Sequence, residues 1–373
     1  MPTLITAPPD GGNIEVLAGD DPLALRLRPR DDVAAPFRQY FCARVATRPG
    51  PVRVAIEGLA ESSYPAGWRD YRPCVSLDGE AWRRVPATYQ DGALSFEAEA
   101  PHGVLHAAYF APYGAARAQR FTARCAASSL AAYAPLGLSA RGQPIERLTV
   151  GDGPRTLWVI ARQHPGETMG SWWMEGFLPK LLDEADEDAR ALRAAATVHV
   201  VPMMNPDGVA AGNLRTNAVG TDLNRAWAEP SAEASPEVLA VRRAMEGTGC
   251  DLFLDVHGDE AIANNFIAGA KGIPGWTDRL EGLQDAYESA LVRLTPDFQR
   301  EEGYGIPAPG RANLKIATNW VAEAFDCLAM TLEMPFKDAK TNPKPDEGWS
   351  PDRCAALARD CLRAMNELTG ALR

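Results

Sequence analysis

The sequence predicts the α/β fold class, with an N-terminal antiparallel β-sandwich followed by an α/β domain whose sheet is largely buried. In residues 13–112, short apolar runs recur between turn signals and helical periodicity is scarce, which is typical of a sandwich. From residue 139 onward, apolar runs of strand length alternate with helical patterns, which indicates a sheet covered by helices. We expect two domains, at residues 1–115 and 116–373.

The expected elements of the first domain are short strands. Apolar runs predict strands at residues 23–27, 40–46, 52–56, 94–96 and 105–110. Asp78-Gly79 is a typical hairpin dipeptide between two further strand-like segments. A helix and a linker are expected over residues 117–130, where the second part begins.

In the second domain, the alternation is regular. Buried strands are expected at residues 146–150, 156–161, 197–203, 251–256 and 327–333. Helical patterns cover residues 169–182, 187–195, 236–246, 278–292 and 351–368. The segment 296–310 is rich in Gly and Pro and is expected to be a mobile loop.

A metal site is predicted where two of these strands end. The tetrapeptide His164-Pro165-Gly166-Glu167 comes closely after the strand predicted at 156–161. A histidine and a glutamate in the turn after a strand can point at one ion, and their ligand atoms suit Zn²⁺. His257 follows the strand predicted at 251–256 and is the expected third ligand, because strand ends in such sheets meet at one edge. A single strand-end histidine more often just satisfies its own hydrogen bonds, but the ordered set favours a metal.

Further polar motifs follow in the order Asn205-Pro206-Asp207-Gly208, Asp222-Leu223-Asn224-Arg225 and Thr331-Leu332-Glu333. Together with H-P-G-E and D-V-H-G, this series resembles the zinc metallocarboxypeptidase family from about residue 151 to about residue 337. H-P-G-E-T with D-L-N-R-x-W resembles its cytosolic carboxypeptidase branch, whose eukaryotic members trim glutamates from tubulin. The resemblance implies a β-sandwich followed by an α/β/α metallocarboxypeptidase domain with a mixed central sheet.

The resemblance also implies a role for each polar residue, with one Zn²⁺ per chain. Glu333 resembles the general base, which takes a proton from water and delivers it to the leaving amine. Arg215 resembles the arginine that stabilises the oxyanion. Asn224 and Arg225 match the pair that grips the terminal carboxylate of the substrate, and Asp222 matches the residue that orients the first zinc histidine.

Each assignment has a plainer reading beside it. Glu333 could face water or pair with Lys337, Arg215 could be a surface loop residue, and Asp222 could simply form a turn. Asp255 and Asp259 flank His257 and could orient it or have no such role.

Two further expectations concern specificity. Tyr304 is the nearest candidate for the mobile tyrosine that the family places over the bound C-terminal residue. Arg311 and Lys315 are basic residues in the region of the specificity pocket. If either lines the pocket, an acidic C-terminal residue is favoured; otherwise both are ordinary surface charges.

Composition excludes several other classes. The formal net charge of −11 argues against binding of nucleic acid or of anionic membranes. No stretch approaches the roughly 20 apolar residues of a membrane span. The N-terminal residues show no signal peptide, and seven cysteines without a C-x-x-C motif are expected to be reduced. We therefore expect a cytoplasmic protein.

The sequence thus predicts a zinc metallocarboxypeptidase that hydrolyses the C-terminal peptide bond of peptides or proteins. One alternative is a zinc amidohydrolase or deacylase acting on small N-acyl amino acids. Another is a binding protein that keeps the fold without catalysis, and the β-sandwich could be an interaction module that selects the target. The sequence does not set an oligomeric state.

Overall fold

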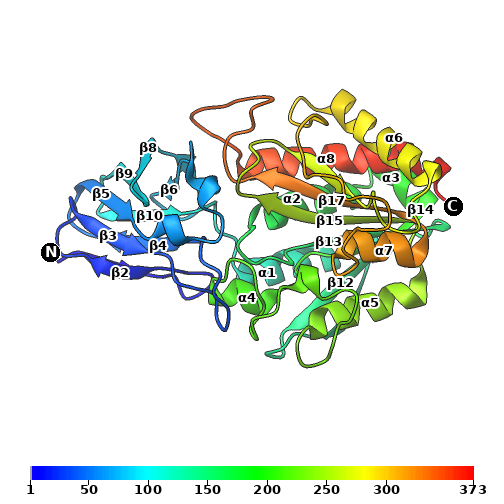
Figure 1. The fold of residues 1–373 in the computed structure, drawn as a ribbon, viewed down its shortest axis with the longest axis horizontal. Helices are drawn as coiled ribbons and strands as arrows, with labels where there is room; N and C mark the ends of the chain where they lie inside the picture. The colour runs from blue at the N-terminus through cyan, green and yellow to red at the C-terminus, as the bar shows by residue number, and fades with distance from the viewer. Residues whose placement is uncertain (1) are drawn as a thin grey trace.

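The computed structural model describes residues 2–373 and divides into two parts that lie side by side along the long axis of the molecule (Figure 1). The first part, blue to cyan, holds two five-stranded sheets. The second holds one seven-stranded sheet with helices on both of its faces. None of the helices in residues 2–373 has the length and apolar character needed to cross a bilayer.

The two N-terminal sheets form the predicted sandwich. One has the order β1-β4-β10-β6-β7, with β1 Leu4–Thr6, β4 Cys42–Ala46, β10 Val104–Ala108, β6 Cys74–Ser76 and β7 Arg83–Arg84. The other has the order β2-β3-β5-β9-β8, with β2 Glu15–Ala18, β3 Leu25–Arg28, β5 Gly50–Ile56, β9 Ala93–Ala100 and β8 Ala87–Gln90. The strands pair antiparallel except β3 and β5, which run parallel.

The sandwich strands alternate between core and solvent, as half-buried strands do. Along β9 every second side chain is buried, including Leu94 and Phe96. The five predicted strands are confirmed as β3, β4, β5, β9 and β10. The predicted hairpin dipeptide lies between β6 and β7, where Gly79 has a φ of +81° that suits glycine.

The seven-stranded sheet is mixed, as expected. Its order is β11-β12-β14-β13-β15-β17-β16, with β11 Ala131–Leu138, β12 Pro144–Val150, β14 Ala196–Val201, β13 Arg155–Ala161, β15 Leu252–Asp259, β17 Leu328–Pro335 and β16 Phe266–Gly269. The four strands β14, β13, β15 and β17 are parallel to one another. The remaining three pair antiparallel at the two sides. The ends of β13, β15 and β17 therefore meet at one edge.

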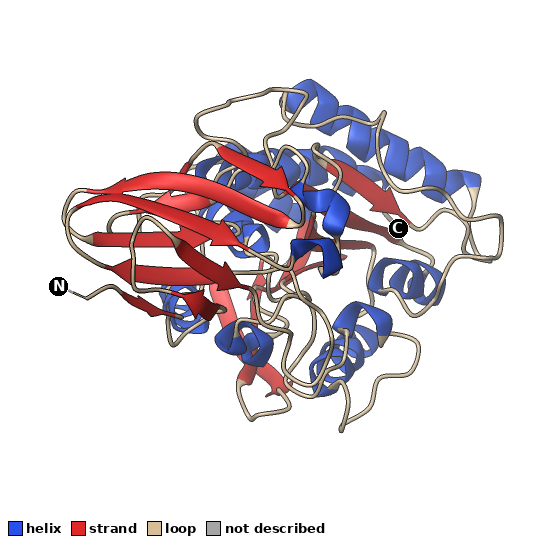
Figure 2. Ribbon diagram, turned by 60° about the vertical axis from the view of Figure 1, so that its left-hand side comes forward, coloured by secondary structure: helices blue, strands red, loops and turns tan. Residues whose placement is uncertain are grey.

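Helices bury both faces of this sheet (Figure 2). One layer contains α2 Met169–Leu181, α3 Glu187–Ala195, α6 Asp278–Leu294 and α8 Pro351–Leu368, and the other contains α5 Pro236–Thr248 and α7 Ala317–Phe325. Successive side chains of β13 point to opposite faces of the sheet, so they pack against different helix layers. Leu157 and Val159 pack in the first core, while Trp158 and Ile160 pack in the second.

The two parts of the chain share a packed boundary. Helix α1, Ala115–Ala126, follows the sandwich directly. Tyr109 of the sandwich stacks on Phe336 after β17, with ring centroids 4.4 Å apart. The buried Arg84 of β7 donates to the carbonyl oxygens of Phe336 and Trp349. These contacts fix the sandwich against the edge of the sheet where the predicted site lies.

The structure contains several elements that the sequence did not predict. They are β1, β2, β8, β11, β16, α7 and the short helix α4, Pro206–Ala211. β16 has only four residues, and β11 contains Pro135 and Gly137 at a register shift, so neither gives a clear strand pattern. The segment 296–310 contains no helix or named strand, as expected for a loop.

Candidate active site

His164, Glu167 and His257 form one compact cluster. Their ligand atoms all lie within 4.8 Å of one another, and all three side chains are buried. The Nδ1 atoms of the two histidines are 3.1 Å apart. One carboxylate oxygen of Glu167 is 2.7 Å from the His164 Nδ1, and the other is 2.8 Å from the His257 Nδ1. Two ring nitrogens and a carboxylate converging on one point are a donor set that suits a zinc ion.

A carboxylate lies next to the outer nitrogen of each histidine. The Nε2 of His164 is 3.1 Å from an oxygen of Asp222, and the Nε2 of His257 is 2.8 Å from an oxygen of Asp255. Gln163 donates from its amide to the same Asp255 oxygen at 2.6 Å. Such outer partners fix the ring orientation and keep Nδ1 directed into the cluster.

The cluster is electrostatically coupled. Burial opposes ionisation of Glu167, but the neighbouring His164 and His257 outweigh it and lower the Glu167 pKa well below its usual range. Burial disfavours the charged form of His257, yet Asp255 and Glu167 raise its pKa well above the ordinary value. The surroundings therefore favour cationic charge at this point, which a metal ion would also supply.

The turn that carries the first two cluster residues is strongly constrained. Arg162, directly after β13, is buried and has a left-handed φ of 63°. Its guanidinium donates to the carbonyl oxygen of Pro165 at 2.6 Å and to the Ser171 hydroxyl at 2.7 Å. At Gly166, a Cβ would approach the Leu214 backbone at 3.0 Å, so a side chain there would force the turn to move. The turn geometry depends on these residues as well as on the cluster itself.

Glu333 lies beside the cluster because of strand register. It pairs with His257 across the parallel strands β15 and β17. Its side chain is buried, and its Oε2 has no hydrogen-bond partner within residues 2–373. Burial raises the Glu333 pKa well above its usual value, although His257 opposes the shift. It makes no salt bridge with Lys337 in the described part of the chain.

Arg215 is linked to His164 through Asp222, which contacts both side chains. Its Nε donates to Asp222 at 2.7 Å, and its Nη1 donates to the Tyr64 hydroxyl at 2.6 Å. Burial opposes the charge of Arg215, but Asp222 and Tyr64 outweigh it and raise its pKa. Its guanidinium is therefore a fixed positive charge connected to the metal cluster through Asp222.

Asn224 and Arg225 lie in a short 3-10 helix, Leu223–Arg225. The Asn224 side-chain oxygen accepts from the backbone N–H of Ala317 at 2.9 Å, which fixes it at the start of α7. Arg225 is exposed, and its Nη1 donates to the Asn224 carbonyl oxygen at 2.8 Å. The Arg225 guanidinium keeps further donors available to a bound molecule.

One cavity of about 380 Å³ joins these groups. It is lined by the predicted residues His164, Glu167, Arg215, Asn224, Arg225, Tyr304 and Glu333. The half-exposed Tyr304 donates from its hydroxyl to Asp259 at 2.8 Å. Small and hydroxyl-bearing residues form another wall, where the Thr318 and Thr331 hydroxyl oxygens lie 2.6 Å apart.

The expected basic pocket residues are placed elsewhere. Arg311 and Lys315 are exposed and are absent from the residues that line the cavity, which agrees with the alternative that both are surface charges. Both belong to the irregular, turn-containing segment before α7. Lys271, just after β16, lines the cavity instead.

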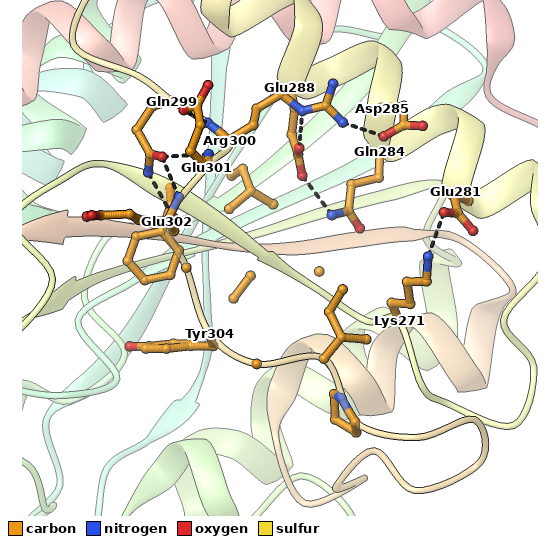
Figure 3. Close-up of a pocket in the computed structure, with 18 of the residues that line it drawn as sticks. Lys271, Glu281, Gln284, Asp285, Glu288, Gln299, Arg300, Glu301, Glu302 and Tyr304 are labelled. Atoms are coloured by element: carbon orange, nitrogen blue, oxygen red, sulfur yellow. Dashed lines mark hydrogen bonds and ion pairs between the residues drawn. The ribbon is translucent and has the colours of Figure 1, made fainter. Parts of the chain in front are cut away.

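A second cavity of about 390 Å³ adjoins the first along β16 (Figure 3). Lys271 and Tyr304 line both cavities. In Figure 3, Lys271 reaches toward Glu281 of α6, and the two groups are 2.6 Å apart. Arg300 forms ion pairs with Glu288 and Asp285 on the far wall. Most of the charges in this second cavity are therefore paired with one another.

Sequence reasoning missed three residues near the site. Tyr64 and Asp32 come from the sandwich, far from the motifs in the chain, and no local pattern marks them. Glu260 directly follows the His257 motif and lines the cavity. Burial raises its pKa well above the usual value, and a carboxyl so close to D-V-H-G could have been flagged from the sequence.

The comparisons with known proteins agree with the two-part architecture. The model of the cytosolic carboxypeptidase N-terminal domain matches residues 5–110, and the zinc carboxypeptidase model matches residues 120–350. An uncharacterized protein of Zymomonas mobilis is 46% identical over 373 residues, covering 100% of this chain and 98% of that protein. Cytosolic carboxypeptidase 3 of Bos taurus is 42% identical over 150 residues, which cover 38% of this chain and only 14% of that longer protein.

Solved structures are similar over the full length. A metallo-carboxypeptidase from Burkholderia cenocepacia has a TM-score of 0.96 at 39% identity, covering 99% of each chain. A metallo-carboxypeptidase from Pseudomonas aeruginosa, solved with (2-guanidinoethylmercapto)succinic acid, has a TM-score of 0.96 at 43% identity, covering 99% of this chain and 100% of that one. Because the family model covers more than half of the residues, the chain belongs to the zinc carboxypeptidase family and is a metallocarboxypeptidase.

Proposed function

We propose that this enzyme removes the C-terminal residue from peptides or proteins at a single zinc ion held by His164, Glu167 and His257. The observation that carries the proposal is the shared cavity. His164 and Glu167 lie at one part of its wall, with the His257 Nδ1 3.1 Å from that of His164, and cationic side chains suited to a carboxylate lie at another. An exopeptidase needs both, because it must hold the chain end while the neighbouring bond is cleaved.

The residues present fit a zinc ion by donor type, convergence and outer support. The two Nδ1 atoms face each other across the Glu167 carboxylate, and Asp222 and Asp255 occupy the outer nitrogens. A bound zinc ion supplies Lewis acidity and lowers the pKa of a water molecule toward about 7. Side chains of the enzyme carry out the other parts of the proposed reaction.

Glu333 is the proposed general base. Its buried carboxylate lies next to His257 and has an oxygen free of protein partners within residues 2–373. It would take a proton from the attacking water and give it to the nitrogen of the leaving amino acid. The C–N bond breaks, the water oxygen becomes part of the new carboxylate, and the amino acid leaves with its amine protonated.

Arg215, Asn224 and Arg225 are proposed to bind the negative charges of the substrate. Arg215 would face the carbonyl oxygen that becomes negative during attack. Asn224 and Arg225 would hold the terminal carboxylate, for which the planar guanidinium fork is suited. The compound named for the Pseudomonas relative contains a succinic acid, so that protein binds a molecule with two carboxylates. This supports carboxylate recognition in the same family.

We further propose a preference for acidic C-terminal residues, now carried by Lys271. It is the lysine that lines the cavity, and its ion pair with Glu281 holds it at the junction of the two cavities. A glutamate side chain could reach this ammonium and the hydroxyls of Thr318 and Thr331. The compound of the Pseudomonas relative also contains a guanidine, so an arginine-ending peptide is the decisive competitor.

The test is the release of amino acids from matched substrates by the zinc-loaded enzyme. Peptides that differ only in a C-terminal Glu, Leu or Arg should all be compared with N-acyl amino acids. Release from peptides but not from N-acyl amino acids supports the carboxypeptidase, and the reverse supports an amidohydrolase. Faster cleavage of the Leu or Arg peptide than of the Glu peptide would contradict the acidic preference alone.

We also propose a division into domains at residues 1–115 and 116–373, and a cytoplasmic location. The division is supported by α1, which begins at Ala115 directly after the sandwich. The location is supported by the seven cysteines, all of which are unpaired and buried.

A further inference from the structure

The N-terminal sandwich places one tyrosine inside the catalytic cavity. Tyr64 directly precedes the 3-10 helix Pro65–Trp68 and lines the cavity together with His164 and Arg215. It is therefore a residue of the first part of the chain that a bound substrate would meet.

The backbone of Tyr64 is fixed by a buried glutamine. Its N–H donates to the Gln39 side-chain oxygen at 3.1 Å, and its carbonyl oxygen accepts from the Gln39 amide at 3.1 Å. Gln39 has an exposed fraction of 0%, and the same amide also donates to the Tyr109 hydroxyl. Both backbone groups of Tyr64 are thus held to the core of the sandwich. Such two-point support is what positions a functional side chain.

The hydroxyl of Tyr64 acts as an acceptor toward the catalytic domain. Arg215 donates to it from Nη1 at 2.6 Å, while its Nε remains on Asp222. A phenol that accepts a hydrogen bond from a guanidinium becomes a stronger donor itself, because hydrogen bonds in a chain polarise one another. The hydroxyl proton of Tyr64 has no acceptor within residues 2–373. It is available to a molecule in the cavity.

We propose that Tyr64 is a further substrate-contacting residue, whose hydroxyl donates a hydrogen bond to the carbonyl oxygen of the scissile bond next to Arg215. The inference rests on the proposed function, because it uses the role assigned to Arg215. Arg215 and Tyr64 then form a pair of donors to one oxygen, with one donor from each domain. A neutral phenol adds a second hydrogen bond without adding a second buried charge, which would cost more to desolvate.

The first test is Tyr64→Phe in the zinc-loaded full-length enzyme, with Tyr89→Phe as the matched control. Tyr89 is likewise a half-buried tyrosine of the sandwich, but it lies outside the catalytic cavity. Tyr64→Phe should lower kcat at least about tenfold with KM within about twofold, because the lost donor acts on charge that develops in the transition state. Tyr89→Phe should match the wild type, and both variants should keep full zinc content.

The outcomes separate this inference from the proposed function. A wild-type enzyme that releases no C-terminal residue from any peptide overturns the proposed function. A wild-type enzyme that does so, with a kcat for Tyr64→Phe within about twofold of it, overturns only the assignment of Tyr64.

A second measurement separates direct contact from support of Arg215. A peptide phosphonate, which presents tetrahedral anionic oxygens, is titrated against the holoenzyme by calorimetry and needs no turnover. Tyr64→Phe should weaken its binding at least about tenfold, as for one hydrogen bond to a charged oxygen, both with Arg215 present and in Arg215→Ala. Weakening seen only when Arg215 is present would show that Tyr64 merely positions that arginine, and the direct contact would be rejected.

Discussion

The carboxylate of Asp32, in the sandwich, accepts a hydrogen bond from the backbone N–H of Arg215 at 2.8 Å. The same carboxylate accepts from the backbone N–H groups of Leu214 and Thr216, and from the Thr216 hydroxyl at 3.0 Å. Asp32 is buried. One side chain of the sandwich therefore fixes three consecutive peptide groups of the loop that carries Arg215.

Replacing Asp32 should disturb catalysis without removing the metal. Asp32→Ala leaves three backbone donors without their acceptor, which should destabilise the protein by about 1–3 kcal/mol. It should also lower kcat, because Arg215 is no longer held in place. Asp31→Ala is the matched control, since Asp31 pairs with Arg38 at the surface. Urea unfolding, zinc content and peptide kinetics measured on both variants check this; equal behaviour of the two would contradict a clamping role.

Removing one of the three proposed zinc ligands should lower the zinc content of the protein. His257→Ala should lower zinc content to well below one ion per chain, because two protein ligands bind zinc weakly. Elemental analysis of the dialysed protein is the measurement. His102→Ala, a substitution in the turn before β10, should retain the wild-type content. Full occupancy in His257→Ala would show that the ligand set is different.

Glu333→Gln should separate binding from chemistry. The amide keeps the volume of the side chain but cannot take a proton from water, so kcat should fall by about 10²-fold or more while KM changes little. The control is Glu246→Gln, at an exposed glutamate of α5. Steady-state kinetics on one peptide are sufficient, and near-normal kcat in Glu333→Gln would exclude it as the base.

If Arg225 binds the terminal carboxylate, the enzyme should distinguish a free C-terminus from an amidated one. The wild type should cleave the free-acid peptide and leave the amide intact. Arg225→Ala should lower kcat/KM on the acid by about 10- to 100-fold, the range for one charge-assisted contact. Arg311→Ala is the matched control, because Arg311 is exposed and lies outside the cavity. Equal rates on acid and amide in the wild type would contradict recognition of the terminal carboxylate.

The buried His199 should make the free energy of unfolding depend on pH, and this dependence does not involve the metal. It is buried in β14 and hydrogen-bonded to the Thr149 hydroxyl at 2.9 Å. Burial and the nearby Arg147 lower its pKa from 6.5 to about 4. Between these values the unfolded chain binds the proton and the folded chain does not. Its stabilising contribution is therefore complete above pH 6.5 and is lost as the pH falls toward 4.

The size of this effect follows from proton linkage. A shift of this extent corresponds to about 3 kcal/mol in the free energy of unfolding. Urea unfolding at pH 7.5 and pH 5, for the wild type and His199→Asn, is the measurement. The difference between the two pH values should be smaller in the variant. An equal difference in both proteins would show that other groups cause the acid sensitivity.

The parts of the site carried by single strands were predictable from the sequence. His164, Glu167, His257 and Glu333 each follow or end a buried apolar run, and the parallel register of β15 and β17 then brings them together. The main strands of the sheet and the helices at 169–182 and 351–368 were predictable for a similar reason. Their apolar spacing is dictated by the two cores they bury.

The parts that depend on distant contacts were not predictable. Tyr64 reaches Arg215 across 151 positions of the chain, and Asp32 reaches it across 183. A pattern read over a short window contains no information about such pairs. The position of Arg311 and Lys315 outside the cavity was not predictable either. Their nearness to the Glu333 strand in the sequence does not determine which way their loop faces. α7 was missed because it is only nine residues long and starts after Ile316, which provides no capping side chain.

The clamp from Asp32 to the Arg215 loop also has a consequence for biosynthesis. Asp32 precedes every residue of the metal cluster in the chain, so the ribosome completes the sandwich strands before it makes the Arg215 loop. The residues that hold the Arg215 loop are therefore already synthesised when that loop is made. The cavity acquires Glu333 only when β17, the last strand in chain order, has been made and has joined the sheet.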